Sequence, residues 1–142
     1  MDTELMNRLK GRIINIESSE SISLVEVKTE IGNICAVVVE TPKTSDYLKV
    51  NNSIYVLFKE TEVSIGKELS GMISLRNRFE CIVEEIQKGK VLTRLVLRCR
   101  DKTIKSVITT RSAENMNIKK GDFVIALVKT NEVSLMEIPD GN

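Results

Sequence analysis

The fold of this chain is decided by a stretch that occurs twice: Lys59-Glu60-Thr61-Glu62-Val63-Ser64-Ile65 and, 70 residues later, Lys129-Thr130-Asn131-Glu132-Val133-Ser134-Leu135. A second pair of blocks has the same spacing, because Leu5-Met6-Asn7-Arg8-Leu9 returns as Leu75-Arg76-Asn77-Arg78-Phe79. Internal similarity at a fixed period is typical of duplicated structural units. The repeat therefore predicts two domains of one fold, residues 1–70 and residues 71–142, with a linker at Gly66–Gly71.

Most apolar stretches in both copies alternate with a period of two, which indicates half-buried strands. The expected strands are residues 9–15, 22–27, 34–39 and 54–58 in the first copy, and 79–86, 91–98, 104–109, 123–128 and 133–138 in the second. Asn51 and Gly121 occupy equivalent turns and tolerate a left-handed backbone. One helical turn is expected per copy, at Thr44–Leu48 and Ser112–Met116. This pattern predicts an all-β fold of tandem five-stranded OB-like barrels.

Composition limits the partners and the compartment. The 142 residues include 21 Lys+Arg and 20 Asp+Glu, so the formal charge of +1 gives no general reason to bind nucleic acid or an anionic membrane. The N-terminus lacks a signal peptide and no apolar run approaches membrane-spanning length. Cys35, Cys81 and Cys99 contain no CxxC pair, and a duplicated disulfide framework is not expected. We therefore expect a reducing cytoplasm.

Catalysis has little support in this sequence. The chain has no His, the commonest general base and transition-metal ligand. Three scattered Cys are too few for a zinc site, and no GxGxxG, Walker or GxSxG motif occurs. These absences favour a binding protein without metal or cofactor over an enzyme.

Three clusters in the second copy collect groups that bind oxyanions. Ser74-Leu75-Arg76-Asn77 supplies a hydroxyl, a guanidinium and an amide just before a strand. Thr109-Thr110-Arg111-Ser112 places hydroxyls at the expected start of a helical turn, where free N–H groups and the helix dipole favour an anion. Lys129-Thr130 adds an ammonium and another hydroxyl. A tetrahedral dianion needs fixed positive charge and several directed donors, which these residues provide.

Each cluster also has a purely structural interpretation. Ser112 suits a helix N-cap, and Thr109 suits an ordinary strand position. Arg76 and Lys129 suit solvated surface charges. The recurrence of the flanking blocks favours function, although a folding requirement would also produce repetition.

The order and spacing of these motifs resemble those of the molbindins, small cytoplasmic molybdate-binding proteins made of one or two Mop (TOBE-type) domains. The family's opening Ser-Ala-Arg-Asn motif is similar to Ser74-Leu75-Arg76-Asn77. Its Thr-x-x-Ser motif, with a following Leu-x-Leu and Gly-Asp turn, is similar to Thr109–Ser112, Met116-Asn117-Ile118 and Gly121-Asp122. Its Lys-Ala-Ser/Thr-x-Val strand end resembles residues 129–133, and the resemblance covers nearly the whole chain.

The resemblance implies a protein that stores or buffers molybdate, or tungstate, in the cytoplasm. It also implies a homotrimer of two-domain chains with sites between subunits, and barrels that are sometimes completed by an exchanged strand. The oxyanion-binding residues that it implies are Ser74, Arg76, Thr109, Ser112, Lys129 and Thr130, with the Leu75 backbone N–H beside them. Asn77 completes the first motif as a further candidate, although Asn7 and Asn77 also suit a structural role.

The first copy departs from this pattern at the positions that matter for binding: Glu4, Met6, Val39, Pro42 and Glu60. Carboxylates of Glu4 and Glu60 would repel a dianion at close range. First-copy sites are therefore expected to be lost or weakened. Lys59, Thr61 and Asn7 stay candidates for a shared site.

Two other function classes stay open. An OB-like module could bind nucleic acid or a protein, but such barrels stack bases on exposed aromatics in a basic groove, and this chain has few aromatics and no basic surplus. The chain could also be a regulatory partner of a molybdate transporter or regulator, because Mop-type domains are found attached to such proteins.

Overall fold

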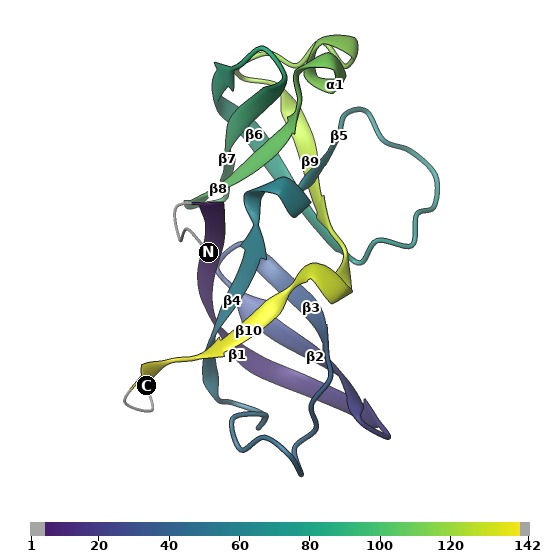
Figure 1. Ribbon diagram of the computed structural model, residues 1–142, viewed down its shortest axis with the longest axis vertical. Helices are drawn as coiled ribbons and strands as arrows, with labels where there is room; N and C mark the ends of the chain where they lie inside the picture. The colour runs from purple at the N-terminus through teal and green to yellow at the C-terminus, as the bar shows by residue number, and fades with distance from the viewer. Residues whose placement is uncertain (1–4, 140–142) are drawn as a thin grey trace.

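The computed structural model describes residues 5–139 as two lobes stacked along one axis (Figure 1). Each lobe is a five-stranded antiparallel sheet that curls into an OB-like barrel, so the predicted fold class is confirmed. The first copy contributes β1 (Met6–Ser19), β2 (Ile22–Thr29), β3 (Gly32–Val38) and β4 (Ser53–Lys59) to its own sheet. The second copy contributes β6 (Asn77–Lys88), β7 (Leu92–Cys99), β8 (Lys102–Thr109) and β9 (Phe123–Val128).

The fifth strand of each sheet comes from the other repeat. β10 (Ser134–Glu137) pairs with β4, with Leu135 opposite Val56, and β5 (Ser64–Gly66) pairs with β9, with Ile65 opposite Ala126. The strand orders are β10-β4-β1-β2-β3 and β5-β9-β6-β7-β8. Figure 1 shows the yellow β10 lying beside β4 of the first lobe. Neither barrel is therefore complete from one half of the sequence.

The two lobes share their irregularities as well as their strands. β1 has a bulge between Ile13 and Asn15, and β6 has one between Val83 and Glu85, at equivalent positions. A bulge bends a strand, which lets one long strand pair on both sides of a curled sheet. Asn51 and Gly121 both have positive φ, 81° and 93°, so the predicted left-handed turns are confirmed.

The predicted helical turns are only half right. The second copy forms α1 (Thr110–Asn115), two residues earlier than predicted. Thr44–Leu48 in the first copy is not a helix but a series of turns, in which the Thr41 carbonyl accepts from the N–H groups of Thr44 and Ser45. This loop is organised by the Glu40 carboxylate, which accepts hydrogen bonds from the Ser45 and Tyr47 hydroxyls.

The linker is longer than predicted and begins later. Gly66 is the last residue of β5, and irregular backbone runs from residue 67 to residue 76. Its start is anchored by the Lys67 ammonium, which lies 3.0 Å from the Asp122 carboxylate and donates to the Asn117 carbonyl. The Asp122 pKa is lowered by the hydrogen bond from the Lys119 backbone and by Lys67.

One disulfide, which the sequence pattern did not predict, joins Cys81 in β6 to Cys99 in β7. Gly11 and Thr29 stand opposite each other at the equivalent positions of the first lobe, so the bond is not duplicated. Both sulfur-bearing residues are buried, and Cys35 is a free buried cysteine in β3. Because disulfides are rare in a reducing cytosol, the cysteine pattern no longer supports the expected compartment.

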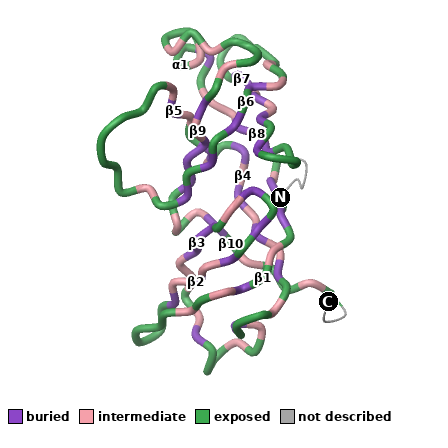
Figure 2. Tube along the Cα trace, turned by 180° about the vertical axis from the view of Figure 1, so that it is seen from behind, coloured by how far each residue is buried: buried purple, intermediate pink, exposed green. Residues whose placement is uncertain are grey.

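A single apolar cluster runs through both lobes and their junction. It includes Phe58, Ile34 and Val63 from the first copy and Phe79, Leu95 and Val133 from the second. Figure 2 shows buried residues along the strands of both lobes, while the long linker on one side is mostly exposed. No helix within residues 5–139 is long and apolar enough to cross a membrane.

Candidate functional site

Two buried asparagines tie the lobes together at equivalent positions. The Asn77 side chain accepts from the Cys35 N–H at 2.7 Å and donates to the Cys35 carbonyl at 2.9 Å. Asn7 makes the same pair of bonds to the Lys105 backbone, at 2.8 and 2.9 Å. Both amides are therefore engaged in contacts between the lobes, which supports their structural interpretation.

One set of predicted donors lies just before β6 and just after β9, next to Asn77 and its partner Val128. We call it the junction group: Ser74, Leu75, Arg76, Lys129 and Thr130. Because Asn77 pairs with Val128, the strand register places Arg76 and Lys129 opposite each other just beyond the ends of β6 and β9. Figure 1 shows the linker returning to the turn between β9 and β10, where η3 (Thr130–Glu132) follows Lys129.

The cations of the junction group face no acidic partner among residues 5–139. Arg76 and Lys129 are exposed, and neither forms a salt bridge there. The Arg76 guanidinium donates to the Cys35 sulfur at 3.9 Å. Ser74 is exposed and Leu75 is half-buried, so the Ser74 hydroxyl is accessible to solvent.

The other predicted donors form a second set at the start of α1. The Thr109 hydroxyl accepts from the Ser112 N–H at 3.1 Å and donates to the Ser112 hydroxyl at 2.8 Å. Thr109, and not Ser112, is therefore the helix N-cap. Thr109 also lines an open pocket of about 310 Å³ together with Lys90, Val91 and Arg111.

Lys90 was missed by the sequence analysis. It lies in the turn before β7, and only the register that places Leu92 opposite Thr109 brings it to this pocket. Arg111 belonged to the predicted cluster, but only its position in the pocket separates it from an ordinary surface charge. We call Lys90, Thr109, Arg111 and Ser112 the distal group.

The junction group and the distal group lie at opposite ends of the second lobe. The first adjoins the start of β6, and the second adjoins β7 and β8 where they run beside the end of β6. β6 has 12 residues, and a strand rises roughly 3.3 Å per residue. Figure 1 shows α1 at the far tip of the molecule and the start of β6 near its middle. One chain therefore does not bring both groups to one small anion.

The first-copy counterpart of the junction group is organised differently. Lys59 precedes η2 (Glu60–Glu62), and Met6 lies opposite Lys59 where the second copy has Arg76. The Glu60 carboxylate is buried and accepts two hydrogen bonds from Arg94 of β7, at 2.9 and 3.0 Å. Glu60 was expected to repel a dianion, and its charge is balanced here by Arg94. Thr61 is exposed, and Glu4 lies outside the described residues.

The first-copy counterpart of the distal group has no matching pair of hydroxyls. Val39 and Pro42 are exposed at the positions of Thr109 and Ser112. Next to them the Glu40 carboxylate accepts from Ser45 at 2.6 Å and from Tyr47. These hydrogen bonds lower the Glu40 pKa, and burial, followed by the Glu40 contact, raises the Tyr47 pKa.

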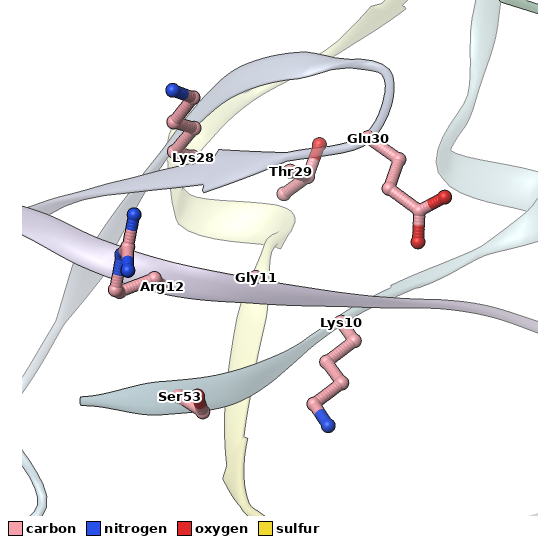
Figure 3. A pocket seen from close by; sticks show the side chains of 7 residues that line it. All are labelled: Lys10, Gly11, Arg12, Lys28, Thr29, Glu30 and Ser53. Carbon is pink, nitrogen blue, oxygen red and sulfur yellow. The ribbon is translucent and has the colours of Figure 1, made fainter. Parts of the chain in front are cut away.

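A separate pocket of about 350 Å³ lies on the first lobe, lined by Lys10, Gly11, Arg12, Lys28, Thr29, Glu30 and Ser53 (Figure 3). Arg12 lies opposite Lys28 across β1 and β2, and Figure 3 shows both side chains on the same side while Lys10 points away. None of the predicted donors lines this open surface. Within residues 5–139 no cluster of three or more His, Cys, Asp or Glu could hold a metal ion.

Comparison with known proteins agrees with this fold. Residues 73–135 match the TOBE domain. That stretch includes every residue of the junction and distal groups. The chain also resembles the crystal structure of the cytoplasmic molybdate-binding protein ModG with molybdate bound, with a TM-score of 0.87 and 23% identity over 93% of this chain and 96% of that chain. At this identity the likeness establishes the fold. A comparison with curated protein sequences found no match.

Proposed function

We propose that this protein binds molybdate or tungstate without catalysis, and that it stores or buffers the oxyanion in the cytoplasm. The observation that carries the proposal is the junction group, where the strand register places the backbones of Arg76 and Lys129 opposite each other and neither side chain has an acidic partner in the described chain. Two adjacent unpaired cations repel each other, so a dianion that accepts from both would be favoured. The Ser74 and Thr130 hydroxyls and the Leu75 N–H would complete its coordination.

The proposed complete site lies between subunits of a homotrimer. The distal group supplies hydroxyls and two cations, Lys90 and Arg111. Within one chain it lies at the opposite end of the second lobe from the junction group, so the two groups do not contact the same anion. A second copy that presents its distal group to the junction group would surround the anion from both sides. Lys59 and Thr61 lie on the first-copy side of the junction and would take part only through such a neighbour, whereas the Asn7 amide bonds the Lys105 backbone.

The comparisons support this assignment in outline. ModG is described as a cytoplasmic molybdate-binding protein, and the match to the TOBE domain covers the proposed donors. In the cytoplasm the Cys81–Cys99 bond would meet thiol reductants. Both cysteines are almost fully buried, which denies a thiolate access to the bond.

A nucleic-acid-binding module has less support. Phe58 and Phe79 are buried, and Phe123 is the one Phe with an exposed ring. Base stacking on an OB-like barrel uses several exposed aromatics in a basic groove.

Titration calorimetry of the purified protein tests the proposed function. Molybdate and tungstate should bind saturably, and sulfate should bind more weakly because its tetrahedron is smaller. An absence of saturable binding for all three anions would overturn the proposal.

A further inference from the structure

The two repeats place equivalent turns, η2 and η3, on opposite lobes, but the side chains at these turns differ in charge. η2 of the first copy packs against β8 of the second lobe, and η3 of the second copy packs against β3 of the first lobe. The Ser106 hydroxyl fixes the first of these contacts by donating to the Val63 carbonyl at 2.6 Å. Glu60 of η2 corresponds to Thr130 of η3, 70 residues later. Arg94 of β7, which bonds Glu60, corresponds to Leu24 of β2.

The Glu60–Arg94 contact has the geometry of a bound anion. The guanidinium donates from Nε and Nη2 to separate carboxylate oxygens, at 2.9 and 3.0 Å. The Glu60 side chain is only 2% exposed, whereas that of Arg94 is 31% exposed. An Arg fork that binds a carboxylate with two parallel bonds offers the same donors to a tetrahedral oxyanion.

The junction has two halves, one around η3 of the second copy and one around η2 of the first copy. The guanidinium comes from a different element in each. In the second-copy half it is Arg76, which has no acidic partner among residues 5–139. In the first-copy half Met6 takes that place, and Arg94 reaches the turn from β7 instead. Lys59 lies beside the turn, just as Lys129 does in the second copy.

We propose that the first-copy half of the junction is an anion site that the protein's own Glu60 carboxylate occupies, with Arg94 as its guanidinium. Glu60 is then a built-in ligand that keeps external oxyanion out of this half, and it sets how many anions a chain binds. The identity of the excluded anion rests on the proposed function, but the occupied site itself does not.

A second internal carboxylate supports this interpretation independently. The first-copy loop that corresponds to Thr109–Ser112 also holds a carboxylate, because Glu40 accepts from Ser45 and Tyr47. Thr110 stands at the equivalent position in the second copy, where it is buried and donates to the Gly89 carbonyl instead. In the first copy, the turn after β4 and the loop after β3 therefore each contain a carboxylate that accepts hydrogen bonds from side chains of the same chain.

The test exchanges the first-copy pair for its second-copy counterpart, one residue at a time. Glu60→Thr removes the built-in carboxylate and releases the Nε and Nη2 donors of Arg94 that it holds, so calorimetry with molybdate and with sulfate should show one additional anion per chain. The matched control is the double variant Glu60→Thr/Arg94→Leu, which carries the pair found at Thr130 and Leu24 and should lose the additional anion. Thermal unfolding gives a second measurement, since added anion should stabilise Glu60→Thr more than it stabilises the double variant.

The outcomes separate this inference from the proposed function. A folded Glu60→Thr protein that binds the same number of anions as the wild type, and gains no extra thermal stabilisation from anion, would overturn the inference. If the wild type binds no anion but Glu60→Thr does, the inference stands and the proposed function fails. If Glu60→Thr unfolds without anion, refolding by added anion supports the inference, and failure to refold contradicts it.

Discussion

At the scale of single residues, the proposed oxyanion binding depends on the two cations of the junction group, Arg76 and Lys129. By sequence alone Arg76 and Lys129 could be ordinary surface charges; the strand register places their backbones opposite each other, and neither has an acidic partner in the described chain. Asn77, the next residue after Arg76, bonds the Cys35 backbone through both its amide oxygen and its amide nitrogen. A residue with a structural contact therefore stands next to the proposed ligand in one motif.

The first prediction concerns these cations. Arg76→Ala and Lys129→Ala should each weaken molybdate binding roughly 10- to 100-fold, because a hydrogen bond to a charged group contributes about 1.5–3 kcal/mol. Calorimetry gives the affinities, and Arg78→Ala removes the same charge from an exposed neighbour as a control. Wild-type affinity in both junction variants would refute the site assignment.

The second prediction concerns Asn77. Asn77→Ala leaves the buried N–H and carbonyl of Cys35 without their partner and should lower the free energy of unfolding by roughly 2–4 kcal/mol. Chemical denaturation measures this loss. Asn33→Ala, at an exposed position in β3, should change stability by less than about 0.5 kcal/mol. Equal effects in the two variants would contradict the assigned role.

At the scale of elements, alternation and turn chemistry predicted most of the strands. Asn51 and Gly121 indicated the left-handed turns before β4 and β9, because these residues adopt positive φ at low cost. The predicted helix at Thr44–Leu48 failed because hydroxyls of that loop bond the Glu40 carboxylate and the backbone turns around it. The local sequence pattern does not reveal whether this segment prefers a helix or a series of turns around the Glu40 carboxylate.

Contacts between distant residues account for the rest of what the sequence did not reveal. β10 has the same alternation whether it pairs with β4 or β9, so strand exchange leaves no local signal. Glu60 and Arg94 are 34 residues apart and belong to different lobes. Cys81 and Cys99 face each other only in the register that precedes the β6 bulge. The sequence thus yielded a set of candidate donors, but it did not reveal that they lie in two separate groups.

The third prediction concerns the disulfide between β6 and β7. Replacing both Cys81 and Cys99 with Ala should lower the free energy of unfolding by about 2–4 kcal/mol, because the bond closes a loop with a sequence separation of 18 residues. A thiol titration of the protein denatured without reductant should detect only Cys35. Detection of all three thiols would show that the bond does not form in the purified protein.

At the scale of the whole molecule, the exchanged strands and the continuous core make the two lobes one folding unit. β5 completes the second barrel and β10 completes the first, so each repeat covers an edge of the other. An uncovered strand edge invites pairing with other chains. The duplication is therefore symmetric in fold, whereas the junction is asymmetric in its charges.

The fourth prediction follows from this exchange. The intact chain should unfold in one cooperative transition, and the fragment 71–142 should be much less stable or self-associate, because its sheet loses β5 and its β10 loses β4. Denaturation followed by both fluorescence and circular dichroism tests cooperativity. Two separate transitions, one matching the isolated fragment, would contradict the prediction.

Native mass spectrometry of the intact protein titrated with molybdate, tungstate and sulfate tests the central claim most directly. The account predicts a homotrimer that gains molybdate or tungstate at saturation and retains little sulfate. An assembly of any size that carries no oxyanion at saturating molybdate or tungstate would contradict it.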